Sequence, residues 1–239
     1  MKPYNKSDQT QTEEVREMFD HIAPTYDRLN HTLSMNIDRV WRRRVVRIVR
    51  RCAPHRILDV ATGTGDLAIA MAQRIHGSQV LGVDISKGML DVARRKIIAA
   101  GIDERVVLDL GDAEHLSVAD GSIDVATVAF GVRNFGDLEG GLREIARTVK
   151  VGGKIIVLEF STPTNPLFRA LYHLYNHRIL PRIGGMISQD RSAYEYLPNS
   201  IEEFPAPAHF LQMMTAAGFH NCRARSQSFG IAQIYIGER

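Results

Sequence analysis

Hydrophobic residues recur at helical spacing near the start of the chain. Between residues 13 and 23 they fall at i, i+3, i+4 and i+7, a period that predicts an amphipathic helix. The residues concerned are Val15, Met18, Phe19 and Ile22. A second helix is predicted over residues 36–52, where one face is apolar and arginine occupies most of the other. Its apolar face consists of Trp41, Val45, Ile48, Val49 and Cys52.

After Pro54 the pattern changes to short apolar runs that alternate with helical stretches. Strands are predicted at residues 56–61, 79–84, 105–110, 123–130 and 153–160. Helices are predicted at residues 66–75, 87–99 and 138–149, between most of these strands. The run IIVLEF at 155–160 is almost entirely apolar, as expected for a strand covered on both faces. Such alternation predicts a parallel, doubly wound α/β sheet.

The last third of the chain departs from that alternation. Residues 164–180 predict an aromatic-rich helix, and residues 208–217 predict another. Two β-like runs, 220–228 and 231–236, flank Phe229-Gly230 and predict a hairpin. This order of elements is typical of class I methyltransferases, whose Rossmann-like sheet is mostly parallel and seven-stranded with a C-terminal β-hairpin. A plain dinucleotide-binding fold has no closing hairpin.

Composition narrows the class of protein without identifying it. The 239 residues are 44% hydrophobic and 24% charged, which suits one α/β domain with modest additions. The net charge of +3 is too small to argue for a nucleic-acid partner. Cys52 and Cys222 are expected to be reduced thiols. Neither a signal peptide nor a run of about eighteen apolar residues is visible, so we expect a cytoplasmic protein.

The first predicted strand leads into a glycine turn. It ends in LDVATGTGD, residues 58–66, where Gly63 and Gly65 fall at the change from strand to helix. Glycine has no Cβ, so it permits a tight turn and lets a ligand contact the backbone. Together with Ala68 these glycines satisfy the dinucleotide pattern GxGxxA. The short match leaves two interpretations open, a ligand-binding turn and a tight turn that binds nothing.

Three aspartates near this turn favour one kind of ligand. Asp59 precedes the turn, Asp84 ends the second strand and Asp112 follows the third. All are expected at the carboxyl edge of the sheet, where α/β sheets bind ligands. Carboxylates there suit an ammonium or sulfonium group and repel a pyrophosphate. The combination predicts S-adenosylmethionine, with Asp84 on the ribose hydroxyls and Asp112 near the adenine; helix capping and a turn role are their alternatives.

Longer motifs resemble the ubiquinone/menaquinone biosynthesis C-methyltransferases, the UbiE/MenG family. They are FDHIAPTYDRLNHTLSMNIDRVWRR (19–43), LDVATGTGD (58–66), VLGVDISKGML (80–90), GDAEHL (111–116), FGVRNF (130–135), LREIARTVKVGGKIIVLEFSTP (142–163) and SAYEYLPNSIEEFP (192–205). The resemblance covers almost the whole chain. It implies methyl transfer from S-adenosylmethionine to a ring carbon of a prenylated quinol. The resemblance favours demethylmenaquinol as that substrate, in menaquinone biosynthesis. The alternative is 2-methoxy-6-polyprenyl-1,4-benzoquinol, in ubiquinone biosynthesis.

The same resemblance implies particular cofactor contacts. They are Thr64 in the glycine turn, Asp84 with the adjacent Ile85, and the pair Asp112-Ala113. The chain departs from the pattern at two positions. Ala129 stands where some members have a cofactor-contacting serine, so that contact is not expected here. Ala61 stands at the first glycine of the turn.

The chemistry requires help with a phenolic proton beside the methylated carbon. A phenol titrates near pH 10 by analogy with tyrosine, so an enzyme must remove that proton or stabilise the phenolate. Arg133 and Asn134, which follow the fourth predicted strand, are the first candidates for this catalytic role. The alternative is that Arg133 pairs with Asp137 or a helix-end carbonyl and only holds the loop. Tyr26, beside Asp27, is predicted in a lid over the cofactor, with ordinary helix packing as the alternative.

Three further features leave alternatives open. His173 and His177 have the i, i+4 spacing of a metal pair, but no third ligand is evident and no metal is expected. The helix at 164–180 is expected either to line a quinone pocket or to pack in the core. The arginine-rich helix at 36–52 either makes a peripheral contact with anionic headgroups or presents a solvated face.

Other functional classes fit the sequence less well. A short-chain NAD(P)-dependent dehydrogenase requires Tyr-x-x-x-Lys, which is absent. An RNA-base methyltransferase requires Asn/Asp-Pro-Pro-Tyr/Phe where FGVRN stands, and an RNA- or membrane-binding module would rest on residues 36–52 alone. We therefore expect a lid at 1–52 and a methyltransferase domain at 53–239 with a substrate-side helical insertion near 161–200. We expect a quinol partner and no nucleic acid, with monomer and homodimer both open.

Overall fold

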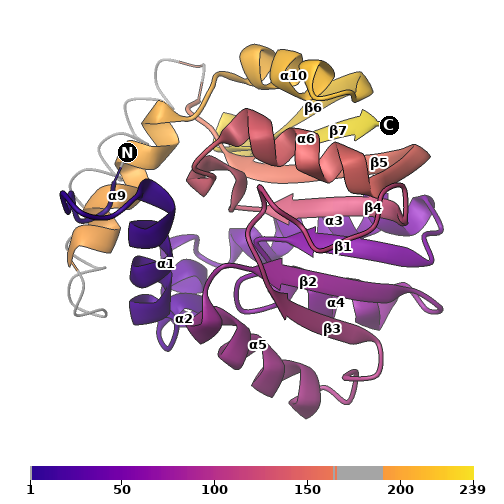
Figure 1. Cartoon of the computed structure of the whole chain (residues 1–239), viewed down its shortest axis with the longest axis horizontal. Helices are drawn as coiled ribbons and strands as arrows, with labels where there is room; N and C mark the ends of the chain where they lie inside the picture. Colours follow the sequence, from indigo (N-terminus) through magenta and orange to yellow (C-terminus); the bar gives the residue numbers. More distant parts are fainter. Residues whose placement is uncertain (1, 164, 166–190) are drawn as a thin grey trace.

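The strands of this chain form one sheet, which the computed structural model describes with its surrounding helices for residues 2–163, 165 and 191–239. In this part of the chain the strand order is β3-β2-β1-β4-β5-β7-β6 (Figure 1). The strand bounds are β1 Arg56–Val60, β2 Gln79–Asp84, β3 Val106–Leu110, β4 Ile123–Ala129, β5 Val149–Phe160, β6 His220–Gln227 and β7 Ala232–Glu238. Strands β1 to β5 are parallel, whereas β7 pairs antiparallel with β5 and β6. The predicted fold class and closing hairpin are confirmed.

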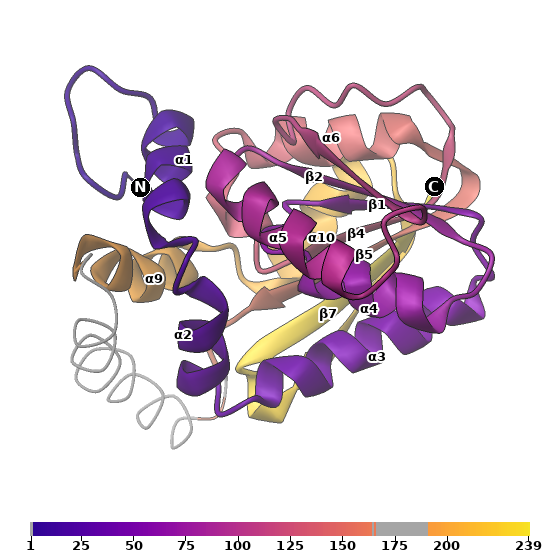
Figure 2. The same ribbon diagram turned by 90° about the horizontal axis from the view of Figure 1, so that it is seen from below.

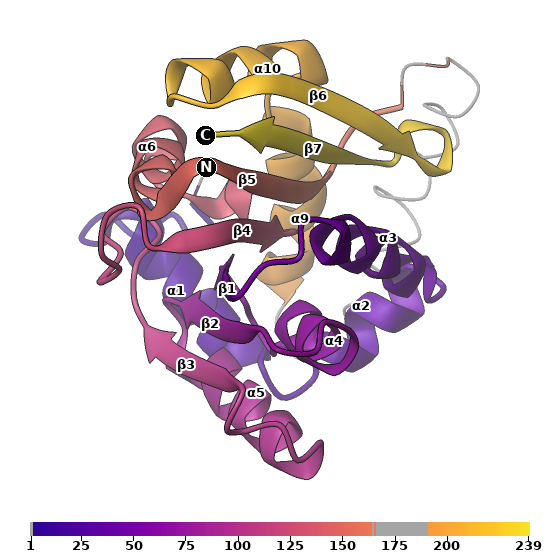
Figure 3. The same cartoon turned by 90° about the vertical axis from the view of Figure 1, so that its right-hand side faces the viewer.

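Helices cover both faces of the sheet and divide its core in two (Figure 3). One face is covered by α3 (Ile37–Arg51), α4 (Asp66–Arg74) and α5 (Lys87–Ala99), and the other by α6 (Leu138–Thr148) and α10 (Pro207–Ala216). Ile155 and Ile156 of β5 enter opposite clusters, as the two-residue period of a strand requires. Because α3 packs in the main core, the arginine-rich helix is held rigidly against the sheet.

A third, smaller cluster lies beyond the carboxyl edge of the sheet. It joins α1 (Gln11–Ile22), α2 (Tyr26–Leu33) and α9 (Arg191–Glu203), which lie side by side in Figure 2. Helix α1 begins with a capping box in which Thr10 and Glu13 satisfy each other's backbone N–H groups. Met89 of α5 and Tyr196 of α9 complete the cluster. These helices therefore cover the edge at which ligands bind to α/β sheets.

The predicted elements agree with the structure except in a few places. Helix α2 was not predicted because its short apolar face consists mainly of Leu29 and Leu33. Strand β5 begins four residues earlier than predicted, at Val149, because the Gly152-Gly153 pair bends the strand without ending it. Helix α9 contains Pro198, which argues against a helix in a sequence read alone. The helix predicted at 164–180 lies outside the described residues. No described helix is long and apolar enough to cross a bilayer.

The core that anchors the hairpin can be tested at Phe210. Its side chain is fully buried between Tyr235, at 4.7 Å between ring centroids, and Phe204, at 5.0 Å. We expect Phe210→Ala to lower the free energy of unfolding by about 3–5 kcal/mol, because a buried ring is replaced by a cavity. Urea denaturation measures the change. Val151→Ala, at a side chain that is 94% exposed, should stay within about 0.5 kcal/mol of the parent.

Candidate functional site

An open cavity lies at the carboxyl edge of the sheet. It encloses about 620 Å³, the solvent at its mouth included, which is the size of a typical small-molecule site. The segments after β1, β2, β3 and β4 supply its floor, and α1 and α2 supply its cover. The lining residues are Thr12, Val15, Phe19, Tyr26, Ala61, Gly63, Asp84, Ile85, Met89, Gly111, Asp112, Ala113, Glu114, Ala129, Phe130, Gly131, Asn134, Phe135 and Gly136.

The carboxylate of Asp84 fixes the glycine turn. Its Oδ2 accepts the N–H of Gly63 at 2.7 Å, and its Oδ1 accepts the N–H of Ser86 at 2.9 Å, where α5 begins. Gly63 and Gly65 both have positive φ angles, 57° and 80°, which glycine adopts readily. Burial raises the pKa of Asp84 to about 6, although the backbone hydrogen bonds oppose the shift. The turn and the carboxylate are therefore mutually positioned before any ligand binds.

The carboxylate of Asp59 is hydrogen-bonded within the protein. It accepts the hydroxyls of Thr62 at 2.7 Å and Thr127 at 2.6 Å, and the residue is only 1% exposed. Burial raises its pKa to about 6, against those two hydrogen bonds. The side chain does not line the cavity. Asp59 thus joins β1, the glycine turn and β4 from behind the cavity lining.

The charge of the cavity lining is entirely acidic. Asp84, Asp112 and Glu114 line the cavity, and among the described residues that line it there is neither lysine nor arginine. A pyrophosphate would meet three carboxylates and no compensating cation, which is unfavourable at short range. A cationic nucleoside without phosphate would be attracted by the same three carboxylates. The lining therefore fits S-adenosylmethionine and does not fit a phosphate-bearing dinucleotide.

Aromatic and apolar side chains from the N-terminal helices cover this acidic floor. Phe19 and Tyr26 both reach the cavity, and their rings meet edge to face with centroids 6.0 Å apart. Burial raises the pKa of the Tyr26 phenol, with nearby Arg133 opposing the shift. Val15 of α1 lines the same wall. The cover excludes water from one side of the cavity, as methyl transfer requires.

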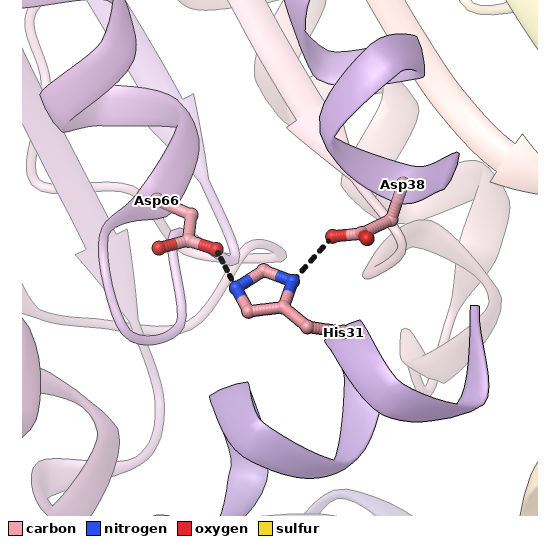
Figure 4. A group of neighbouring side chains, drawn as sticks. All are labelled: His31, Asp38 and Asp66. Atoms are coloured by element: carbon pink, nitrogen blue, oxygen red, sulfur yellow. Dashed lines mark hydrogen bonds and ion pairs between the residues drawn. The ribbon is translucent and has the colours of Figure 1, made fainter. Parts of the chain in front are cut away.

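A network of charged side chains holds this cover onto the glycine turn. Thr64 donates its hydroxyl to Asp27 of α2. Lys96 of α5 donates to Asp27 at 2.7 Å and to Asp66 at 2.6 Å. His31 of α2 continues the network, with Nδ1 2.9 Å from Asp38 and Nε2 3.4 Å from Asp66 (Figure 4). The glycine turn and the N-terminal helices are thereby coupled through ionic contacts.

The same network contains the side chains of a candidate cation site. Ligand atoms of His31, Asp38 and Asp66 all lie within 4.8 Å of one another. However, Arg42 already pairs with Asp38 and lies 4.0 Å from Asp66. Burial raises the pKa of Asp66, but Arg42 and Lys96 outweigh it and lower the pKa overall. We interpret the group as an ion-pair network between helices, in which protein cations already compensate the carboxylates.

Arg133 is held by a buried carboxylate in β5. Its guanidinium donates to Glu159 at 2.7 Å and to the carbonyl of Phe130 at 2.6 Å. The two side chains are 6% and 0% exposed. Burial disfavours the charged guanidinium, but Glu159 outweighs it and raises the pKa of Arg133. The partner is Glu159 and not the Asp137 considered from the sequence, so Arg133 at least fixes the loop after β4.

Asn134 reaches the cavity while its neighbour does not. The hydroxyl of Tyr196, in α9, donates to Asn134 Oδ1 at 3.0 Å. Burial raises the pKa of Tyr196 to about 12, with Arg133 opposing the shift. Arg133 and Tyr196 instead line a separate cavity of about 470 Å³, the solvent at its mouth included. Asn134 therefore belongs to the wall of the first cavity, and Tyr196 holds its side chain from outside that cavity.

The predicted site residues divide into two groups. The cavity lining includes Tyr26, Gly63, Asp84, Ile85, Asp112, Ala113 and Asn134. The residues that stand behind the lining are Asp59, Thr64, Gly65 and Arg133. Sequence reasoning missed Glu114, Glu159 and Tyr196. Glu159 could have been noticed, because it is the only acid in the apolar run IIVLEF.

The chain is similar to known methyltransferases over almost its whole length. The model of the ubiE/COQ5 methyltransferase family matches residues 6–239. A demethylmenaquinone methyltransferase of Bacteroides fragilis is 42% identical over 239 residues, covering 100% of this chain and 97% of its own. One of Thermus thermophilus is 47% identical over 222 residues, covering 93% and 100%. The structure of a SAM-dependent methyltransferase from Thermotoga maritima, titled a possible histamine N-methyltransferase, is similar in fold. Its TM-score is 0.63 at 18% identity, with 93% of this chain and 98% of that chain covered.

The buried carboxylate of Asp84 makes stability depend on pH in a testable way. Its pKa is raised from 3.8 to about 6, so the folded state binds a proton more tightly than the unfolded chain. The contribution of this group to stability is therefore present below about pH 4 and is lost as pH rises through about 6. Asp84→Asn removes that loss, because the amide stays neutral.

We expect the free energy of unfolding of Asp84→Asn, minus that of the parent, to increase as the pH is raised from 4 to 7.5. The shift should be about 2–3 kcal/mol. Urea denaturation at several pH values measures it. A difference between the two proteins that does not change with pH would contradict the assignment.

Proposed function

This chain belongs to the ubiE/COQ5 methyltransferase family and is an S-adenosylmethionine-dependent methyltransferase, and from that premise we propose that its methyl acceptor is a ring carbon of a prenylated quinol. We propose demethylmenaquinol, converted to menaquinol, as the substrate. The observation that carries the proposal is the pairing of an acidic, phosphate-excluding cavity with an aromatic cover. The acidic cavity suits the cationic cofactor, and the aromatic cover suits an apolar aromatic substrate.

The cofactor contacts follow from the cavity lining. Asp84 is proposed to accept the ribose hydroxyls, and Ile85 to pack beside the adenine. Asp112 and Ala113 are proposed at the adenine edge, and Gly63 at the amino-acid end. Thr64, Gly65 and Asp59 are proposed to act through the shape of the turn, since none of them lines the cavity. Of the segment 1–52 expected to be a lid, residues 2–33 are proposed to act as one, because α3 packs in the main core.

The residues of this chain then have defined tasks in methyl transfer. Bound S-adenosylmethionine supplies an electrophilic methyl group on a sulfonium. Phe19, Tyr26 and Phe130 line the cavity, where they would exclude water and orient the quinol ring toward the bound cofactor. The acidic floor favours the positively charged cofactor over its neutral product, which assists release of the product form.

The phenolic oxygen beside the reacting carbon requires stabilisation. Tyr196 occupies Oδ1 of Asn134, which leaves the Asn134 amide N–H groups to donate toward the cavity. We propose that Asn134 donates to the quinol oxygen, where negative charge develops. Arg133 is proposed to favour that charge from behind the wall, with Glu159 fixing its orientation. Tyr26 is proposed to contact the ring from the lid side.

Two alternatives concern the substrate, which could be a benzoquinol, and the cofactor, which could be NAD(P). A methoxy-polyprenyl-benzoquinol is the second candidate substrate, because a relative from Geotalea uraniireducens, 46% identical over 228 residues, is named a ubiquinone/menaquinone biosynthesis C-methyltransferase. NAD(P)-dependent oxidation is not supported, because the acidic lining opposes a pyrophosphate. A prenylated quinol dissolves in a bilayer, so we propose that the enzyme works as a peripheral protein at the cytoplasmic face of a membrane, through the basic helix α3.

A methyl-transfer assay tests the proposed function. Purified protein is given labelled S-adenosylmethionine and either a prenylated demethylnaphthoquinol or a prenylated methoxy-benzoquinol, both chemically reduced. We expect label in the quinol ring and the higher kcat/KM with the naphthoquinol. Calorimetry should show cofactor binding that Asp84→Ala abolishes. Tight NADH binding with no labelled quinol would overturn the proposal.

The role of Tyr196 in positioning Asn134 can be measured separately. We expect Tyr196→Phe to lower kcat by about ten- to a hundredfold, because the freed amide can rotate away from the quinol oxygen. Cofactor affinity by calorimetry should stay within about twofold, since Tyr196 does not line the cofactor cavity.

Two controls make that test specific. Ser200→Ala removes another buried hydroxyl of α9, bonded only to the carbonyl of Leu197, and should leave kcat unchanged. Combined with Asn134→Ala, Tyr196→Phe should cause no further loss if it acts through the amide. Fully multiplicative losses would show that Tyr196 works independently of Asn134.

A further inference from the structure

We propose that the face formed by the α2–α3 turn, the outer side of α3 and the β6–β7 turn docks on an anionic lipid bilayer and delivers the quinol to the cavity. The inference deepens the proposed function, because it rests on the substrate being a lipid. It adds a defined surface, named below the docking face. The docking face consists of Met35, Val40 and Phe229 together with Arg39, Arg43, Arg44 and Arg47.

Large apolar side chains are exposed together on this face. Met35 is 73% exposed, Val40 42% and Phe229 71%. Met35 and Phe229 each occupy the tip of a tight turn, with φ angles of 50° and 59°. A positive φ is unusual for bulky residues. Both turns nevertheless adopt it, and their side chains are exposed. Apolar side chains raised on turn tips suit insertion into a bilayer rather than packing in a groove.

Specific contacts bring the three segments together. The indole Nε1 of Trp41 donates to Ser228 Oγ at 3.0 Å, one residue before Phe229. Arg44 donates to Gln227 at the end of β6. Figure 2 shows the α2–α3 turn beside the β6–β7 turn at the beginning of α3. Because these contacts join segments almost 190 residues apart in sequence, the exposed side chains form one surface.

The charge of the docking face complements an anionic surface. The exposed arginines of α3 are Arg39, Arg43, Arg44, Arg47, Arg50 and Arg51. Among the described residues, Arg42 is the only arginine of this helix in an ion pair with a carboxylate. Val40 lies one helical turn from Arg43 and Arg44, so apolar and basic side chains alternate around the surface. A second copy of the chain is disfavoured as the occupant, because self-pairing would oppose arginine to arginine.

An aromatic path connects this face with the cofactor cavity. Phe130 lines the cavity and stacks on Phe160, with centroids 4.5 Å apart. Trp41 contacts both rings, at 6.1 Å each, and bonds to the β6–β7 turn. These three rings form a mostly buried aromatic cluster that joins the β6–β7 turn to the cavity wall. The docking face and the reaction site lie at the same edge of the sheet, since β7 begins opposite the end of β5.

Vesicle sedimentation tests the proposal with the whole chain. The probes are sucrose-loaded phosphatidylcholine vesicles, with or without about one-third phosphatidylglycerol. We expect the protein to pellet with anionic vesicles and much less with neutral ones. Arg43→Gln with Arg47→Gln should lower partitioning about tenfold or more, in a salt-dependent way. Met35→Ser with Phe229→Ser should lower it by a similar factor that salt does not change.

Matched controls lie on α5, away from the docking face. Arg94→Gln with Arg95→Gln removes the same charge, and Ile98→Ser alters a side chain that is 62% exposed. These should pellet like the parent, and all variants should bind S-adenosylmethionine normally. Equal losses on α5 and on the docking face, or pelleting unaffected by either docking variant, would overturn the proposal. The proposal would also be overturned if an acidic protein displaced the chain from vesicles and the Met35→Ser, Phe229→Ser variant bound vesicles like the parent. That result would indicate a protein partner for the arginines.

A soluble substrate separates this inference from the proposed function. With a short-tailed quinol in solution, the docking variants should keep the parent kcat/KM. With a long-tailed quinol in anionic vesicles, they should lose activity in proportion to partitioning. If the parent methylates neither quinol, the proposed function fails, whereas the sedimentation result stands by itself. If it methylates both and the docking variants behave like the parent with vesicles, only the docking face is refuted.

Discussion

The carboxylate of Asp84 joins two elements that must be aligned before a ligand can bind. It accepts backbone N–H groups from Gly63 in the glycine turn and from Ser86 where α5 begins. Burial makes its negative charge unfavourable, and the backbone N–H donors oppose that effect. The conformation of the glycine turn and the start of α5 both depend on this one buried group, which also contributes one of the three carboxylates of the cavity lining. Asp59 supports it from behind by holding Thr62 and Thr127.

The N-terminal helices complete the site through charge rather than through the main core. Asp27 accepts hydrogen bonds from both Thr64 and Lys96, so α2 and the glycine turn share one ionic network. The Lys96–Asp27 pair is partly buried, with side chains 30% and 29% exposed. Helix α3 differs, because Val45 and Val49 are buried in the main core. The N-terminal segment therefore contributes both to the cover of the cavity and to the main core.

Ala61 and Gly131 illustrate how the turn tolerates its departure from the expected glycine. Ala61 has a φ of 52°, which a side chain disfavours, and its Cβ faces Gly131. A Cβ on Gly131 would lie 2.4 Å from that of Ala61. The absent side chain after β4 thus makes room for the extra methyl after β1. Ala129, which lines the cavity nearby, leaves this wall apolar where a serine would be polar.

The sequence by itself determined the fold class, most elements, the acidic glycine turn and the family, because these depend on local periodicity and on short contiguous motifs. Asp84 and Asp112 could be placed at one edge, since parallel strands end together. Tertiary structure alone decided which side chains face the ligand. Asp59 accepts hydrogen bonds from two threonines, and Arg133 pairs with Glu159. A buried charge requires a partner close to it in space, whatever the distance along the chain. Tyr196 reached Asn134 across 62 residues, and Trp41 reached Ser228 across 187, and no local pattern encodes such separations.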